Sequence, residues 1–197
     1  MTEWDSFWEK RTKQEKVLNR LGVIFNRAFA RHIARYMAKN CSGGPILEIG
    51  TGRGVCAKAL TKMGYDCTGV DNSEVALNLA KKENINTVFA DARHLPFGSK
   101  TFEVAFTQGL LEHLSFDDQF AVLSEMRRVA HITINSVPMK YGVMDIGERA
   151  FHLVRRKWPY PDEKKYKKSE FVALLTTCFK TVRVERFWWV DWIAYCR

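Results

Sequence analysis

The segment 46–54, ILEIGTGRG, constrains the fold more than any other part of this chain. It is a short apolar run that leads into a loop with Gly50, Gly52 and Gly54, and a helical pattern follows directly. Glycine allows positive φ and lets the backbone approach a ligand closely. A strand, a glycine loop and a helix in this order indicate a βαβ unit whose loop faces a ligand.

Short apolar runs alternate with helical patterns after the Ser-Gly-Gly-Pro break at 42–45, which is typical of a parallel sheet. Strands are expected at 46–50, 66–70, 86–90, 103–107, 131–136, 181–188 and 190–196. Helices are expected at about 54–63, 73–83 and 116–129, and a further one begins at Ser169. Asn72 or Ser73 can cap the helix at 73–83, and Gly64 can close the helix before it in the left-handed conformation. The last two strands are expected to form a hairpin that closes the sheet.

One amphipathic helix is expected over residues 14–39, because apolar side chains recur there at helical spacing. Its other side is basic, and like charges four residues apart repel one another unless an anion offsets them. The basic residues are Lys16, Arg20, Arg27, Arg31, Arg35 and Lys39. Three interpretations stay open for this side: a solvated surface, an anion-binding face and a membrane-surface helix.

The net charge of +9 is concentrated at two flanks. Segments 1–40 and 139–168 each carry nine basic and four acidic residues, whereas 41–138 carries nine basic and eleven acidic residues. This split suggests a core that prefers a cationic or neutral ligand, with flanks that attract an anionic partner. Segment 138–168 mixes its lysines with Trp158, Tyr160 and Tyr166. A solvated lid packed on the core and a surface that holds phosphates and stacks bases both remain open.

The ends of the expected strands are acidic, and this argues against a dinucleotide ligand. A nicotinamide or flavin fingerprint needs a third glycine where this chain has Val55. Three strands end in Glu48, Asp71 and Asp91, which would repel a pyrophosphate. These carboxylates suit a ligand with hydroxyl groups and positive charge of its own, which describes S-adenosylmethionine.

Three blocks of the sequence resemble the class I S-adenosylmethionine-dependent methyltransferases, in particular the type 11 group related to quinone-biosynthesis methyltransferases. The blocks are LEIGTGRG, GVDNSEVALNLAKK and DARHLPFGSKTFEVAFTQGLLEHL, and the resemblance as a whole covers roughly residues 44–138. The later stretch SEFVALLTTCFKTVRVERF is similar to the last helix and strand of that group. The resemblance implies an α/β, Rossmann-like class I fold: a seven-stranded, mostly parallel sheet with a C-terminal antiparallel hairpin and helices on both faces.

The resemblance also implies residues for the methionine part of the cofactor. Glu48 would face the methionine ammonium, usually through water. The backbone at Gly50, Thr51 and Gly52 would line the amino-acid portion. Gln108 would lie near the same end. The product left in this site would be S-adenosyl-L-homocysteine.

The adenosine part is assigned in the same way. Asp71 would bind the two ribose hydroxyls, with Asn72 beside it. Asp91 would accept a hydrogen bond from the adenine amino group, while the backbone at Ala92 and Arg93 would contact the adenine ring. No catalytic residue is assigned, since an electrophilic methyl group needs a base only if the acceptor must lose a proton. The residues able to act as a base are His94, His113, Tyr141 and His152.

Length and composition favour one methyltransferase domain over residues 1–197. Its expected parts are an N-terminal helix at about 14–39, a cofactor-binding core at 44–138, a basic lid or substrate segment at 138–168, and a C-terminal helix and hairpin at 169–197. No apolar run approaches the ~18 residues that cross a bilayer, and the N-terminus lacks the apolar segment of a secretory signal. A soluble, cytoplasmic protein is therefore expected.

The cysteines indicate neither a disulfide framework nor a zinc site, because they form no CxxC pair and no histidine lies at ligand spacing. No metal site is expected. The five residues, read as buried thiols, are Cys41, Cys56, Cys67, Cys178 and Cys196.

The expected activity is direct, in-line methyl transfer to a small-molecule or metabolite acceptor. Two alternatives remain: an RNA methyltransferase that uses the basic N-terminal helix and segment 138–168, and a module that binds the cofactor without turnover. The run 187–193, FWWVDWI, would pack under the N-terminal helix or form a dimer through the sheet edge, so monomer and homodimer both stay open.

Overall fold

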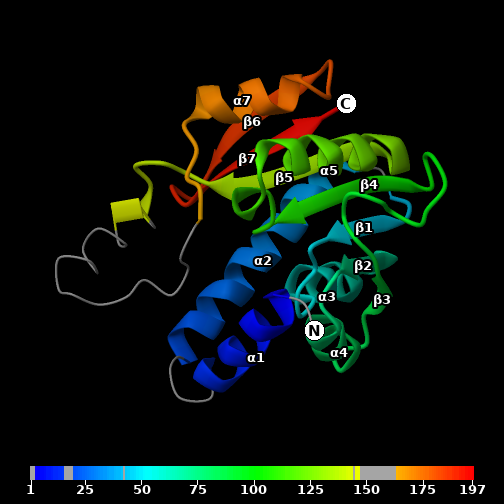
Figure 1. Ribbon diagram of the computed structural model, residues 1–197, viewed down its shortest axis with the longest axis vertical. Coiled ribbons are helices and arrows are strands. Elements are labelled where there is room, and N and C mark those ends of the chain that lie inside the picture. Colours follow the sequence, from blue (N-terminus) through cyan, green and yellow to red (C-terminus); the bar gives the residue numbers. More distant parts are fainter. Residues whose placement is uncertain (1–2, 16–19, 42, 144, 147–162) are drawn as a thin grey trace.

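The computed structural model describes residues 3–15, 20–41, 43–143, 145–146 and 163–197. A seven-stranded sheet runs through the middle of the molecule, and helices cover both of its faces (Figure 1). This three-layer α/β arrangement confirms the fold class expected from the sequence.

Five strands form a parallel sheet, and a C-terminal hairpin extends it. The strands are β1 (Ile46–Ile49), β2 (Cys67–Asp71), β3 (Asn86–Phe89), β4 (Phe102–Gln108), β5 (Ala130–Pro138), β6 (Val182–Phe187) and β7 (Asp191–Cys196). Their order across the sheet is β3-β2-β1-β4-β5-β7-β6, with β7 antiparallel to β5 and β6. The chain order reverses between β1 and β4, and ligands of open α/β sheets bind at such a switch point.

The helices divide between the two faces of the sheet. They are α1 (Glu3–Glu15), α2 (Arg20–Asn40), α3 (Val55–Lys62), α4 (Glu74–Lys81), the 3₁₀ helix η1 (Leu111–His113), α5 (Phe116–Val129) and α7 (Lys168–Thr176). Residues from α2, α3 and α4 share one apolar core with the sheet, and residues from α5 and α7 share the other.

Strand β1 shows how the sequence makes this arrangement. Ile46 packs into the core under α2 and α3, while Leu47 and Ile49 pack into the core under α5. Successive side chains of a strand point to opposite faces, so a strand covered on both sides must be apolar at nearly every position. Glu48 is the exception, since its side chain is ionisable and only 4% exposed. A carboxylate buried in a central strand needs a structural or functional reason.

The element boundaries agree closely with expectation from residue 46 onward. Each strand begins and ends within two residues of its predicted limits. Ser73 caps α4, because its hydroxyl oxygen accepts a hydrogen bond from the Ala76 amide at 3.2 Å. Gly64 follows α3 with φ of 90°, as expected for a left-handed helix end.

The N-terminal prediction was wrong in its limits. The single helix expected at 14–39 is two helices, because α1 ends at Glu15 and α2 begins at Arg20. The amphipathic interpretation of the second helix is confirmed for its described side chains. Ile33, Ala34 and Met37 are buried, and the basic residues on the other side are exposed. These exposed residues are Arg31, Arg35 and Lys39.

Segment 138–168 is described only at its two ends, and Trp158, Tyr160 and His152 lie outside the described residues. Tyr166 is 1% exposed, and its hydroxyl accepts a hydrogen bond from the Gln119 side chain at 2.6 Å. The Tyr166 carbonyl accepts another from the Trp192 indole at 2.9 Å. Tyr166 is therefore a core residue and is not available to stack on a base.

The aromatic run at the hairpin packs under α2. The rings of Phe187 and Phe29 meet edge to face at 5.1 Å, and the His32 ring lies 4.7 Å from that of Trp188. Trp189 remains 59% exposed at the turn. Four of the cysteines are buried thiols as expected, and Cys41 is half-buried. Within the described part of the chain, no helix combines the length and apolar character that a membrane span requires.

Candidate active site

The glycine loop makes a tight turn between β1 and α3. The amides of Gly50 and Thr51 both donate to the Val70 carbonyl at 2.9 Å, which ties the loop to β2. Gly52 and Gly54 adopt positive φ of 53° and 72°. A side chain at Gly52 would also collide with α1, because its Cβ would lie 2.5 Å from Cζ2 of Trp8. Glycine is thus required here both by conformation and by close approach.

The Glu48 side chain, from β1, is hydrogen-bonded to this loop and to α3. Its Oε2 accepts hydrogen bonds from the Thr51 hydroxyl at 2.7 Å and from the Ala57 amide in α3 at 2.9 Å. Burial raises the pKa of the Glu48 carboxyl to about 8, although these two donors oppose the shift, and the nearby Asp71 adds to it. A cation placed beside Glu48 would stabilise its ionised form.

Asp71 joins the glycine loop to the start of α4. Its Oδ2 accepts from the Gly52 amide at 2.8 Å, and its Oδ1 accepts from the Ser73 amide at 3.0 Å. Burial raises the pKa of Asp71 against these donors. The Ser73 hydroxyl in turn donates to Asp5 of α1 at 2.6 Å. One polar chain therefore links the N-terminal helix to the ends of β1 and β2.

Asp91 lies in an ion-pair chain that the sequence did not suggest. The Arg93 guanidinium contacts Asp91 at 2.6 Å and Asp118 of α5 at 2.9 Å. Arg93 lowers the pKa of Asp91 below its ordinary value. Asp118 belongs to the acidic first turn of α5, which was visible in the sequence, but its approach to Arg93 requires the fold.

Two adjoining pockets open at the carboxyl ends of the parallel strands. Pocket A, of about 350 Å³, lies against the ends of β2 and β3, and pocket B, of about 260 Å³, lies against the ends of β1 and β4. Trp4, Trp8, Gly50 and Gly109 line both pockets.

All ten expected site residues line one of the pockets. Those in pocket A are Gly50, Asp71, Asn72, Asp91, Ala92 and Arg93. Those in pocket B are Glu48, Gly50, Thr51, Gly52 and Gln108. In pocket B, Gln108 accepts a hydrogen bond from the Cys56 thiol at 2.8 Å, which orients its amide. The fold thus brings together residues that lie up to 60 positions apart in the sequence.

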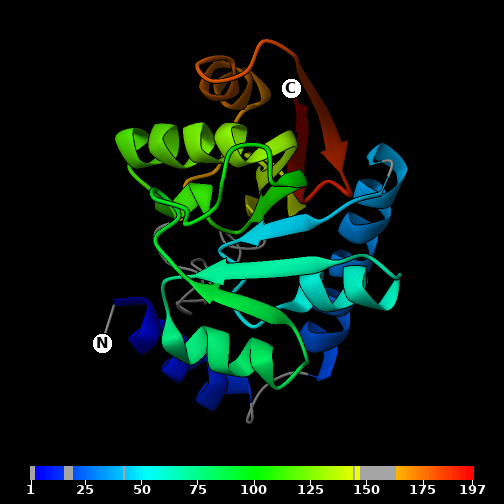
Figure 2. The ribbon, with the colours of Figure 1, turned by 90° about the vertical axis from the view of Figure 1, so that its right-hand side faces the viewer.

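Helix α1 covers both pockets, and sequence reasoning missed it. Figure 2 shows α1 beside α4, at the end of the sheet toward which the arrows of the parallel strands point. Trp4, Phe7 and Trp8 have the spacing of one helical face, and this pattern could have predicted α1 from the sequence. Their rings meet edge to face, at 5.6 Å for Trp4 and Phe7 and at 5.4 Å for Phe7 and Trp8.

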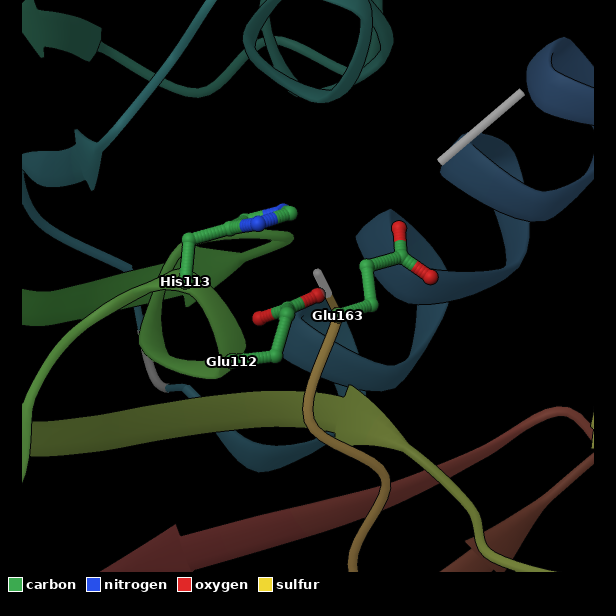
Figure 3. A group of neighbouring side chains, drawn as sticks. All are labelled: Glu112, His113 and Glu163. Atoms are coloured by element: carbon green, nitrogen blue, oxygen red, sulfur yellow. The ribbon is translucent and has the colours of Figure 1, made fainter. Parts of the chain in front are cut away.

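A second group of residues missed from the sequence lines pocket B. The side chains of Glu112, His113 and Glu163 each have an oxygen or nitrogen atom that could bind a metal ion, and these atoms lie within 4.8 Å of one another. Figure 3 shows that Glu163 comes from the segment before α7. Asp191, at the start of β7, lines the same pocket, and burial raises its pKa to about 6 against a hydrogen bond from Ser136. Of the residues named earlier as bases, His113 lines pocket B, whereas His94 and Tyr141 are exposed and line neither pocket.

A family match covers the central part of the fold. A family model described as a methyltransferase domain matches residues 46–131, from β1 to the start of β5. The sheet order, with one antiparallel strand inserted beside β5, is the arrangement that the sequence resemblance implied. The matched segment is similar to a methyltransferase domain, and the fold is that of the class I S-adenosylmethionine-dependent methyltransferases.

Among curated proteins, the chain is similar to two ubiquinone biosynthesis O-methyltransferases. The mitochondrial protein of Schizosaccharomyces pombe is 25% identical over 147 residues, which are 69% of this chain and 51% of the relative. The protein of Coxiella burnetii is 35% identical over 78 residues, which are 36% of this chain and 33% of the relative. The chain thus spans about half or less of the length of these relatives.

Among solved structures, the chain is similar over nearly its full length to a Thermotoga maritima protein. That protein is described as a SAM-dependent methyltransferase and possible histamine N-methyltransferase. The match has a TM-score of 0.75, a sequence identity of 16% and a coverage of 98% of both chains. The likeness extends the shared fold beyond the region that the family model matches.

Proposed function

We propose that this protein transfers a methyl group from S-adenosylmethionine to a small-molecule acceptor. The observation that carries the proposal is the meeting of Glu48, Asp71 and Asp91 around two adjoining pockets at the carboxyl ends of parallel strands. Ligands of open parallel sheets bind at that end. The three carboxylates suit a ligand with hydroxyl groups and positive charge, and they disfavour a pyrophosphate.

We assign the adenosine part of the cofactor to pocket A. Asp71 would accept hydrogen bonds from the ribose hydroxyls, with Asn72 beside it. Asp91 would accept from the adenine amino group, while the backbone of Ala92 and Arg93 addresses the ring. Arg93 already donates hydrogen bonds to both oxygens of the Asp91 carboxylate, so the adenine amino group would replace one of these contacts.

We assign the methionine part to the end of pocket B that adjoins Gly50. Both hydrogen bonds that the described residues make to the Glu48 carboxylate reach Oε2, so Oε1 is the oxygen assigned to the ammonium group. The backbone of Gly50, Thr51 and Gly52 would line the rest of the amino-acid portion, and Gln108 would border it. Positive charge at this point would also offset the cost of ionising Glu48 in a buried position.

The role of the protein in this reaction is positioning and exclusion of water. When bound, S-adenosylmethionine supplies an electrophilic methyl group on a positively charged sulfur. The chain must then hold an acceptor atom in line with that group, about 3 Å away, which alone can supply several kcal/mol. Trp4 and Trp8 line both pockets and would keep water from the space between them.

A small molecule suits the acceptor pocket better than RNA does. The two relatives named above act in ubiquinone biosynthesis according to their names. Pocket B is about 260 Å³, which suits a metabolite. Its acidic residues would repel phosphates, and Tyr166 of the basic segment is buried.

Two measurements on the whole protein test the proposal. Calorimetry with S-adenosylhomocysteine is expected to give one binding site per chain. Incubation with methyl-labelled S-adenosylmethionine is expected to place label in a small-molecule fraction of a cell extract. Absence of cofactor binding would refute the proposed function, and label recovered in RNA instead would refute the assigned class of acceptor.

A further inference from the structure

Pocket B is acidic to a degree that cofactor binding does not require. Its lining includes four carboxylate side chains, from Glu48, Glu112, Glu163 and Asp191. Among the described residues that line this pocket, Arg53 is the sole lysine or arginine. Glu48 is assigned to the cofactor, which leaves three carboxylates around the space for the acceptor.

Glu112 is the buried member of this group. It is 4% exposed, and its Oε2 has no hydrogen-bond partner among the described residues. Burial raises the pKa of Glu112 well above its ordinary value, and the nearby charges of Asp191 and Glu163 raise it further. A buried carboxylate oxygen without a donor is costly, and a donor supplied by a ligand would remove that cost.

Aromatic rings also line pocket B. Trp4, Phe7 and Phe29 line it, and the Trp4 ring meets the His113 ring edge to face at 5.4 Å. The faces of aromatic rings attract cations, most strongly those of tryptophan, and their area favours an apolar ligand body. Carboxylates and aromatic rings in one pocket match a ligand with an apolar part and a cationic nitrogen.

We propose that pocket B receives an apolar amine as the methyl acceptor, with its ammonium group on Glu112 and the aromatic rings of α1 against its body. This inference rests on the proposed function and names the class of its substrate. Glu163 and Asp191 add negative charge around the same point, and Figure 3 shows Glu163 on the far side of Glu112 from the sheet. An acceptor without an N–H or O–H group would leave the Glu112 oxygen without a donor, and a neutral donor would not offset the charge of the surrounding carboxylates.

The chemistry balances with Glu112 as the proton acceptor. The ammonium nitrogen loses one proton to the Glu112 carboxylate, which gives it a lone pair. That lone pair forms the N–CH₃ bond as the C–S bond breaks, and the bonding electrons remain on sulfur. The products are a methylated amine and S-adenosylhomocysteine. A carboxyl group whose pKa is raised by burial is better matched to this transfer than an exposed one.

Matched probes test the inference by binding alone. Tryptamine and tryptophol differ in an amino against a hydroxyl group, as do phenethylamine and 2-phenylethanol. Calorimetry in the presence of saturating S-adenosylhomocysteine is expected to give tighter binding of the amine in each pair. Glu112→Gln is expected to weaken amine binding about tenfold or more, since a buried charged partner is lost, and to leave the alcohols unchanged.

Asp117→Asn is the matched control. Asp117 is an exposed carboxylate in the first turn of α5 and lines neither pocket, so its loss changes the net charge equally. Amine binding should be the same in this variant as in the natural sequence. An equal loss in both variants would mean that net charge and not the Glu112 contact holds the amine, and would overturn the inference.

The remaining outcomes separate the two proposals. If S-adenosylhomocysteine itself does not bind, the proposed function fails. If it binds but the amines bind no better than their alcohols, only the amine inference fails. Titration with magnesium and manganese chloride checks the same residues, because Glu112, His113 and Glu163 include ligand types that hold divalent ions. Metal binding that is lost in Glu112→Gln would overturn the amine inference in favour of a metal site.

Discussion

Asp71 has a structural role and a proposed role in cofactor binding, and the two can be separated by experiment. Its carboxylate accepts from the amides of Gly52 and Ser73, which joins two loops, and its remaining lone pairs face pocket A. In the proposed complex those lone pairs receive the ribose hydroxyls. A substitution should therefore affect the stability of the loops and the affinity for cofactor by different amounts.

Asp71→Asn is expected to weaken S-adenosylhomocysteine binding by about tenfold to a hundredfold, because hydrogen bonds to a charged group contribute roughly 1.5–3 kcal/mol. Calorimetry measures the affinity, and urea unfolding of the free protein measures the stability separately. Asp66→Asn is the control, since Asp66 is an exposed carboxylate just before β2. Equal affinity in Asp71→Asn and the natural sequence would contradict the assigned role.

The residues that sequence reasoning found and missed differ in one respect. Glu48, Asp71 and Asp91 each lie within two residues of the end of a strand, so a linear pattern was enough to propose them. Asp191 reaches the pocket that Glu112 lines because β7 pairs with β5 in the register that sets Asp191 opposite Pro138, and Pro138 lines the same pocket. Nothing in the local sequence specifies that register, so their meeting could not be predicted.

Helix α1 is held to the domain at two points near the pockets. Trp8 packs on Gly52, and Asp5 accepts from Ser73 at the start of α4. The sequence signal for α1 was present but short, because three aromatic residues at helical spacing also fit an irregular segment. Longer apolar patterns, such as that of α5, were located to the residue.

Gly52→Ala is expected to destabilise the protein by more than the roughly 1–2 kcal/mol of a left-handed alanine, because the new methyl group also meets Trp8. Adding Trp8→Ala should recover the part of the loss due to that contact. Gly64→Ala is the matched control: φ is also positive there, but nothing lies within 4 Å of the added carbon. Urea unfolding of the double-mutant cycle should show coupling for Gly52 with Trp8 and additivity for Gly64 with Trp8.

The serine caps of α4 and α5 allow a second comparison, of the stability lost when each cap is removed. Ser73→Ala removes the cap of α4 and the contact with Asp5, whereas Ser115→Ala removes an exposed cap of α5. Loss of a serine cap costs about 1 kcal/mol. Thermal unfolding is expected to show the larger loss for Ser73→Ala. Equal losses would mean that the contact between Asp5 and Ser73 does not hold α1 in place.

At the scale of the whole molecule, buried acids set the pH dependence of stability. The folded-state pKa is about 8 for Glu48 and about 6 for Asp191, above the ordinary values of 4.5 and 3.8. The folded protein therefore holds protons that the unfolded chain releases. The stability these groups contribute is fully present below their ordinary pKa values and is lost as pH rises through the folded ones.

The free energy of unfolding of the cofactor-free protein is thus expected to fall between about pH 5 and pH 8, where the exposed and ion-paired carboxylates no longer titrate. Urea unfolding at a series of pH values measures this slope. Glu48→Gln should reduce the slope above pH 6. A stability that rises over this range would show that Glu48 is ionised in the folded protein without a bound cation.

The order of strands and helices could be predicted because each element has a recognisable pattern within its own short stretch of sequence. Each strand is a short apolar run bounded by loop residues, and parallel strands joined by helices have few allowed topologies. Helix α1 and the contents of pocket B depend on contacts between distant segments, such as Trp8 with Gly52 and Lys164 with Glu112. Local sequence patterns cannot predict such contacts.

Because α1 covers both pockets, it affects how the cofactor and the acceptor enter and leave. Trp4 and Trp8 belong to one helix and line both pockets, so a movement of α1 that releases one ligand also exposes the other. Under the proposed function, the donor and the acceptor could then not exchange independently. The departures of S-adenosylhomocysteine and of the methylated product should both wait for this helix to move, and pre-steady-state kinetics should show a single slow step common to both.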